Sequence, residues 1–458
     1  MSRLDTVVSR GLLLFMVLFP YIVIIDNIYI SRTKLKWFVL TMFATFLLIV
    51  LMLKWLRKEV EVSTYRSPIF ILLGIQLVLI SLSTILSIKP AISLNGYNQR
   101  YEGLTAWFSY FVLFFMIYSS KIPLHRFRSL LRISVISSVF ISIIGILQHF
   151  GVDYIISEYG NSFGSRSAAY FGNPNFFGSY LVLFVILSSY FYLIADTRRD
   201  MLLYFGISCI HFIALLYSGT RSGWIGTGIG LLVFAFILYT KHRNSIKKFS
   251  LLAVAFIFIF FLISITESSS YFGRVMSIFK DANSALVDGN EHAGSSRWYI
   301  WSKGLPLIKD HPLLGSGPDT FAYVFPDDPV GKEKYMHNPD IIVDKAHNEY
   351  LQIAVTMGIP ALIVHLSLLF FILWKGRKAI LDAGNNDILL IAVLLSAVLG
   401  YMAQAFFNIS VVTVAPYFWL LAGALGAYSD RSRLHPAKKA EKREGHSSNR
   451  VEDIGNIV

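Results

Sequence analysis

Four short polar motifs, each placed directly before a long apolar run, carry the residues that could do chemistry. The motifs span residues 98–103, 172–175, 218–223 and 346–350. Since apolar runs of this length are expected to form helices, each motif lies at a helix N-terminus, where unpaired backbone N–H groups and the helix dipole favour an anion. Their recurrence predicts a single anion-binding face.

Three arginines are the predicted phosphate ligands of this face: Arg100, Arg221 and Arg297. The planar guanidinium group makes two-point contacts with phosphate, so a diphosphate suits such a set. A simpler alternative exists for each residue alone. An arginine at a membrane boundary often reaches toward lipid headgroups, and Glu102 could be only the ion-pair partner of Arg100.

His347 is the predicted general base, because an imidazole with a pKa near 6.5 can take a proton from an acceptor hydroxyl at neutral pH. The chain contains no His-Glu-x-x-His motif, no cysteine pair and no Gly-x-x-x-x-Gly-Lys loop, so neither a metal nor a nucleotide cofactor is predicted. Phosphate chemistry without these groups indicates a lipid diphosphate donor.

Other residues of the motifs and of the following loop are predicted to contact substrate. They are Tyr101, Glu102, Asn173, Asn175, Ser218, Thr220, Asn348 and Trp298. Several have a structural alternative. Asn173 followed by Pro174 fits an N-cap and first helical turn, and Ser218 or Thr220 can cap the next helix.

The elements that position these residues are expected to be membrane-spanning helices. The chain has 458 residues, of which 55% are hydrophobic and 15% charged, whereas soluble domains carry about 25% charged residues. Apolar runs long enough to cross a bilayer recur throughout. We predict an all-α polytopic membrane protein with about twelve spans, near residues 10–27, 36–54, 68–88, 104–120, 129–150, 174–195, 201–218, 221–240, 249–266, 351–374, 387–407 and 411–428.

This pattern divides the chain into four parts. Residues 1–266 hold the first nine spans, residues 267–350 form a large extracytoplasmic loop, and residues 351–428 hold the last three spans. Residues 429–458 are charged and lack apolar periodicity, which predicts a disordered basic cytoplasmic tail. Within the loop, one apolar helical face ending at Pro312 predicts an interfacial helix; its members are Trp298, Trp301, Leu305 and Ile308.

The net charge of +13 is explained by topology and membrane lipids, and no nucleic-acid partner is predicted. Lys and Arg are most frequent in the short loops that become cytoplasmic when both termini are placed inside. The expected location is therefore the cytoplasmic membrane, with the four motifs outside. The single cysteine, Cys209, excludes a disulfide within one chain and a cysteine metal site.

Five segments in order resemble the O-antigen ligase and polymerase superfamily: RYEGL, FGNPNFFGSYL, YSGTRSGWIG, SSRWYIWSKGLPLIKDHPLLGSGPDTF and KAHNEYLQIAVTMGIPAL. The resemblance implies a GT-C-like, metal-independent transferase. Such an enzyme moves a glycan from undecaprenyl diphosphate to a lipid, glycan or protein acceptor outside the cytoplasmic membrane. It also implies that Arg221 and Arg297 hold the diphosphate and that His347 activates the acceptor.

Alternative functions remain open at this point. A polymerase of lipid-linked repeat units would use the same donor. A transporter of a lipid-linked glycan would instead need polar groups at mid-membrane, and the candidates are scattered: Asp26, Gln76, His211, His365 and Gln404. A sensor or scaffold without catalysis would tolerate loss of the arginines.

Overall fold

The computed structural model describes residues 2–23, 32–59, 67–98, 100–152, 164–267, 271–274, 276–277, 296–382 and 388–430. All regular structure in these ranges is helical, and they contain no β-strand. The predicted fold class, an all-α polytopic membrane protein, is confirmed.

Ten helices of the described ranges are long and apolar enough to span a membrane. They are α1 (Arg3–Leu18, extended to Tyr21 by the 3-10 turn η1), α2 (Arg32–Leu56), α3 (Pro68–Ile85), α6 (Leu124–His149), α7 (Pro174–Leu193), α8 (Arg198–Tyr217), α9 (Arg221–Lys241), α10 (Ile246–Thr266), α16 (Ile359–Asp382) and α17 (Ile388–Ala405). Two shorter helices, α5 (Leu104–Ser119) and residues 415–430, complete the bundle. Each of the twelve predicted spans overlaps one of these helices.

The predicted span at 351–374 is two helices rather than one. The chain forms α15 (Glu349–Met357), turns at Gly358 with φ of +87°, and continues as α16. A Cβ atom at Gly358 would lie 2.3 Å from the carbonyl oxygen of Leu313. The helix therefore breaks where the loop before it packs against its backbone, a contact that apolar periodicity does not report.

The core of the bundle forms around α7, all of whose spanning residues are buried, and around the contact between α9 and α17. This contact is close because glycines face each other. A Cβ atom at Gly226 would lie 2.5 Å from the carbonyl oxygen of Gly400. Small residues let membrane helices approach in this way and gain van der Waals contact along the backbone.

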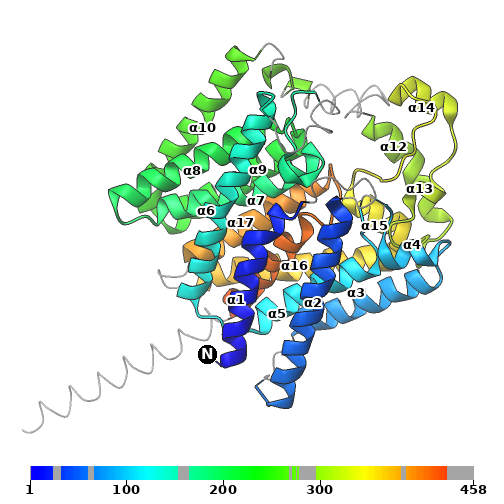
Figure 1. Ribbon diagram of the computed structural model, residues 1–458, viewed down its shortest axis with the longest axis horizontal. Helices are drawn as coiled ribbons and strands as arrows, with labels where there is room; N and C mark the ends of the chain where they lie inside the picture. The colour runs from blue at the N-terminus through cyan, green and yellow to red at the C-terminus, as the bar shows by residue number, and fades with distance from the viewer. Residues whose placement is uncertain are drawn as a thin grey trace, which may run out of the picture.

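Short helices form a separate layer at one end of the bundle, away from the N-terminus (Figure 1). They are α12 (Arg297–Gly304), α13 (Phe321–Val324) and α14 (Pro329–Met336). We call the bundle end that meets this layer the loop end. The interfacial helix predicted from Trp298 corresponds to α12 and the 3-10 turn η5 (Leu305–Lys309), which takes over where Pro306 cannot continue an α-helix.

The predicted tail begins too early, since residues 429–430 still belong to the last helix. The remainder of the predicted tail, like much of residues 267–295 in the predicted loop, lies outside the described residues.

Candidate active site

Three arginine side chains gather at the loop end of α7, α8 and α9: Arg166, Arg221 and Arg274. Arg166 donates to the carbonyl oxygen of Ser218 at 3.0 Å and to Oδ1 of Asn175 at 2.9 Å. Burial, together with the charges of Arg274 and Arg221, lowers the pKa of Arg166 from its ordinary value to about 10. The three cations thus repel each other. We call this group the arginine cluster.

Neutral oxygens of the described residues help to hold the arginine cluster in place. Arg221 donates from Nη1 to the hydroxyl of Ser277 at 2.7 Å, and Arg274 approaches the carbonyl oxygen of Gly219 at 3.4 Å. Within the described ranges, neither Arg166 nor Arg274 has a carboxylate partner. Grouped guanidinium charges that neutral oxygens orient are suited to bind an anion.

A tight turn between α8 and α9 allows the three arginine side chains to lie close together. Gly219 lies at the corner with φ of +58°, and a Cβ atom there would lie 3.0 Å from Nη1 of Arg274 and 3.1 Å from Nε of Arg166. Thr220 takes the N-cap position of α9, but its hydroxyl donates to the carbonyl oxygen of Pro174 at 2.8 Å instead of capping the helix. This bond fixes the corner to the first turn of α7.

Asn173 occupies the N-cap position of α7, as its sequence context predicts, and accepts from the backbone N–H of Asn175 at 2.8 Å. The side chain of Asn175 in turn accepts from Arg166. The amide of Asn173 is therefore used in capping, whereas Asn175 connects α7 to the arginine cluster.

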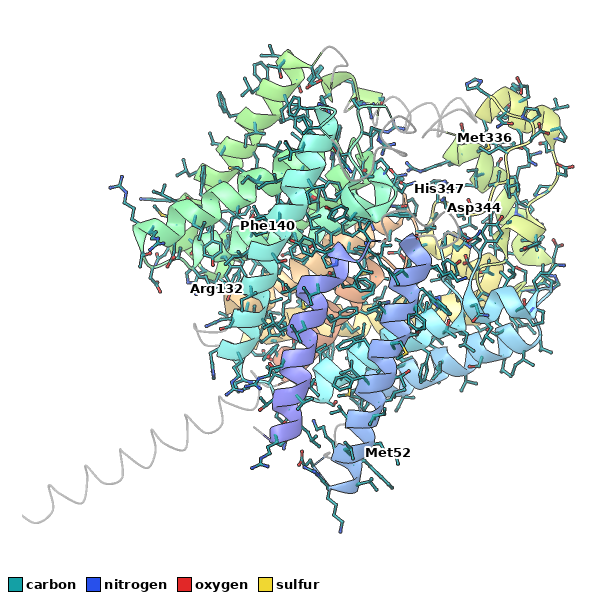
Figure 2. All side chains as sticks on the ribbon, in the orientation of Figure 1. Met52, Arg132, Phe140, Met336, Asp344 and His347 are labelled. Atoms are coloured by element: carbon teal, nitrogen blue, oxygen red, sulfur yellow. The ribbon has the colours of Figure 1, made fainter. Side chains whose placement is uncertain are left out.

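His347 lies in a second charged group, in front of α15. Its backbone is set by neighbours on both sides. The N–H of Ala346 donates to Oε1 of Gln352 at 2.8 Å, the carbonyl oxygen of Ala346 accepts from Trp301, and Asn348 caps α15. Figure 2 shows His347 and Asp344 between the helix bundle and the layer of α12–α14.

The electrostatic environment keeps the imidazole of His347 neutral. Burial and the nearby charges of Lys345, Arg297 and Arg100 lower the pKa of His347 well below its ordinary value. The Nδ1 atom makes no hydrogen bond with the described residues. A neutral ring without a structural hydrogen bond at this nitrogen is what a general base requires.

Arg100 is held by acidic residues, and its Nη1 makes no hydrogen bond with the described residues. Its guanidinium forms a buried ion pair with Asp319, and its Nε lies 3.9 Å from Asp344. Asp319 also accepts from the backbone N–H groups of Tyr97 and Glu102. This arrangement is that of a structural ion pair, and it fits the alternative of ion pairing more closely than phosphate binding, although the partner is Asp319 and not Glu102.

A small cavity lies beside this ion pair. Its lining includes Arg100, Glu102 and Glu349, and its volume of about 30 Å³ has room for two or three waters, since each needs about 10–15 Å³. Glu102 accepts from the hydroxyl of Tyr110 at 2.5 Å, and burial raises its pKa well above the ordinary value. Burial also raises the pKa of Glu349 to about 8.

The first turn of α7 lies between the two charged groups, and its residues contact both of them. On one side, Asn175 accepts from Arg166 of the arginine cluster. On the other side, the ring of Phe176 lies 5.8 Å from the ammonium of Lys345, whose charge acts on His347. The predicted trio is thus divided: Arg297 and His347 are neighbours, and Arg221 belongs to the arginine cluster beyond α7.

Comparison with known proteins gives one family match. Residues 203–366 match the family model of O-antigen ligase. Over these residues the chain is similar to the O-antigen ligases. The resemblance that the motifs indicated is therefore confirmed by this match.

A curated relative gives no further detail about the reaction. An uncharacterized protein of Haemophilus influenzae is 27% identical over 236 residues, which are 49% of this chain and 57% of that protein. The chain thus spans little more than half the length of that relative.

The segment that matches the family model contains Arg221, Arg274, Arg297 and His347, whereas Arg166 precedes it. Sequence reasoning missed Arg166, Arg274 and Lys345. Arg166 and Arg274 stand in polar segments that look like ordinary solvated loops, and no spacing rule connects them to α9. Lys345 could have been found, because it lies two residues before His347.

Three further residues that were predicted to contact substrate make contacts within the protein. Tyr101 stacks on Trp37 with ring centroids 5.6 Å apart and donates to Asn98. The hydroxyl of Ser218 donates to the carbonyl oxygen of Leu215. Trp298 lies next to Trp301 on α12, with ring centroids 6.2 Å apart.

Proposed function

We propose that this protein transfers a glycan from undecaprenyl diphosphate to a hydroxyl group of an acceptor. One observation carries the proposal: a partly buried cluster of three guanidinium groups at the loop end lies across α7 from a histidine that is held neutral. The guanidinium groups are suited to bind a diphosphate, and the neutral histidine is suited to take a proton from a hydroxyl.

The reaction that fits these groups is a direct displacement at the sugar carbon. His347 takes the proton of the acceptor hydroxyl, whose oxygen forms a new bond to the anomeric carbon. The bond between that carbon and the phosphate oxygen breaks, and its electron pair leaves with undecaprenyl diphosphate. Arg221, Arg166 and Arg274 stabilise the additional negative charge, with a contribution of about 3–4 kcal/mol for each well-placed donor. Arg297 binds the donor at a position beside His347.

The loop end is proposed to face the outside of the cytoplasmic membrane, with both termini in the cytoplasm. The N-terminus and the α12–α14 layer lie at opposite ends of the bundle, which supports this orientation (Figure 1). In that position the polyprenyl chain of the donor remains in the bilayer while its diphosphate reaches the ends of α7, α8 and α9. The acceptor, a lipid, glycan or protein, approaches from the side of His347.

The test is glycan transfer by the purified full chain in lipid nanodiscs. The donor is a labelled undecaprenyl-diphosphate glycan, and the acceptors are a lipid A core, a repeat-unit glycan and a protein. Arg221→Ala, Arg297→Ala and His347→Ala should each lower the transfer rate by at least about 100-fold. Matched controls are Arg243→Ala, just beyond the opposite end of α9, and His311→Ala, an exposed histidine after α12.

The products separate the competing functions. A new glycosidic bond to a different acceptor indicates a ligase, and a lengthened lipid-linked glycan indicates a polymerase of repeat units. Relocation of the intact lipid between leaflets, without a new bond, would indicate a transporter and overturn the proposal. Full activity of His347→Ala would reject its role as base.

A further inference from the structure

Lys345 lies between the arginine cluster and His347. Its ammonium is 5.8 Å from the ring centroid of Phe176 in the first turn of α7, and among the cations near His347 its charge lowers the pKa of that imidazole most. Its side chain is only 17% exposed. The residue therefore places a positive charge in the space that connects the two halves of the candidate site.

The described residues hold this ammonium only through long contacts, an ion pair with Asp344 and the ring of Phe176. The closest carboxylate oxygen, Oδ1 of Asp344, lies 3.7 Å away, which is beyond hydrogen-bond distance. The other oxygen of Asp344 lies 3.9 Å from Nε of Arg100, so this carboxylate is shared loosely between two cations. An ammonium group has three N–H donors. A single long contact with Asp344 leaves N–H donors of Lys345 available to a ligand.

The order of groups in the proposed donor matches the order of groups in the protein. A lipid-linked donor runs from polyprenyl chain to first phosphate, second phosphate, sugar carbon and finally the attacking hydroxyl. Along the site the order is bundle, arginine cluster, Lys345 and His347. The phosphate next to the lipid thus falls at the arginine cluster, and the phosphate next to the sugar falls near Lys345.

We propose that Lys345 binds the sugar-side phosphate of the donor, while Arg166, Arg221 and Arg274 bind the lipid-side phosphate. This inference rests on the proposed function, because it assigns the two phosphates of the same donor. Lys345 then provides a second attachment point, which a lipid monophosphate cannot use. The ammonium also lies where negative charge develops as the sugar–phosphate bond breaks.

The inference predicts that Lys345 sets the preference for a diphosphate over a monophosphate. The full chain in nanodiscs is titrated with undecaprenyl diphosphate and, separately, with undecaprenyl monophosphate, and the two dissociation constants are compared. Wild type should prefer the diphosphate. Lys345→Met should weaken diphosphate binding by about 10- to 100-fold and leave monophosphate binding within about 2-fold, so that the preference is lost. Lys345→Arg should retain most of it.

Two further variants make the result specific. Arg166→Gln should weaken binding of both lipids, because both carry a lipid-side phosphate. Lys303→Met is the matched control, since Lys303 is 41% exposed and pairs with Asp328 at 3.1 Å on the outer layer; it should change neither constant. Lys345→Gln, which keeps a polar side chain, replaces Lys345→Met if that variant does not fold.

The outcomes distinguish this inference from the proposed function. If wild type binds the diphosphate lipid but Lys345→Met weakens both lipids equally, or weakens neither, the role of Lys345 is rejected while the proposed function stands. If wild type binds neither lipid and transfers no glycan, the proposed function fails and this inference fails with it.

Discussion

The guanidinium of Arg100 is paired with the carboxylate of Asp319, a residue 219 positions further along the chain. Each side chain is only 2% exposed. The pair joins the segment before α5 to the segment before α13, since Asp319 also accepts from the backbone N–H groups of Tyr97 and Glu102. It therefore attaches the outer layer of the protein to the bundle.

Removing one member of this pair should destabilise the protein. Arg100→Ala leaves Asp319 buried without its counter-charge, and such losses cost about 3–5 kcal/mol. The expected result is a clear fall in the melting temperature in detergent. The double variant Arg100→Met/Asp319→Asn should lose much less, because no buried charge is left and the Asn oxygen can still accept from the backbone N–H groups of Tyr97 and Glu102. If Arg100→Ala kept its melting temperature and lost only donor affinity, Arg100 would be a phosphate ligand after all.

The sequence predicts those features of the fold that depend on neighbouring residues, such as helices and their caps. Apolar runs located the twelve spans, and the Asn173-Pro174 pair marked the start of α7. The pairing of Arg100 with Asp319 and the gathering of Arg166, Arg221 and Arg274 depend on how distant segments pack. Neither follows from spacing, so an arginine that binds a carboxylate and one that faces other arginines look alike in sequence. The placement of Arg297 beside His347 was anticipated only through the family resemblance.

Gly219 should be required for the arginine cluster rather than for folding alone. Gly219→Ala places a methyl group against Arg274 and Arg166, at 3.0 and 3.1 Å, and should lower donor affinity by about 10-fold or more, as when a charged hydrogen bond is lost. Gly164→Ala is the matched control, because its φ of +63° is similar while its Cβ atom would meet nothing within 4 Å. In both variants alanine must adopt a positive φ, which costs about 1 kcal/mol of backbone strain. Equal donor affinity in the two variants would contradict this account.

The contact between α9 and α17 should tolerate no side chain at Gly226. Gly226→Leu would bring Cβ within 2.5 Å of the carbonyl oxygen of Gly400 and force the helices apart, costing about 1–3 kcal/mol or more. Gly228→Leu serves as the control on the same helix, since nothing lies within 4 Å of its Cβ position. Thermal unfolding of both variants in one detergent checks this. A similar melting temperature for the two would show that close helix packing is not needed.

Glu349 should destabilise the protein as the pH rises. Its folded pKa of about 8 lies above the ordinary value of 4.5 because burial disfavours the charged form. The folded state therefore retains a proton that the unfolded state releases, and stability falls between pH 4.5 and about 8. Near pH 7.5 the loss is on the order of 4 kcal/mol. Glu349→Gln cannot ionise, so its gain in melting temperature over wild type should grow from pH 5 to pH 8.

The exposed Glu333→Gln variant is the control for the Glu-to-Gln substitution itself. A gain for Glu349→Gln that stays constant from pH 5 to pH 8 would mean that Glu349 ionises normally in the folded protein.

The pH profile of glycan transfer should report the environment of His347. A protonated imidazole cannot accept a proton, so kcat/KM falls as the pH drops through the histidine pKa. Burial and the charges of Lys345, Arg297 and Arg100 lower this pKa well below 6.5, so wild type should keep its full rate at pH 6.5 and lose it only at more acidic pH. Removing one cation with Lys345→Met should move the acid limb to higher pH, whereas Lys303→Met should not move it. An acid limb at or above pH 6.5 in wild type would show that the neighbouring cations do not act on the base, and a limb unchanged in Lys345→Met would place the titrating group elsewhere.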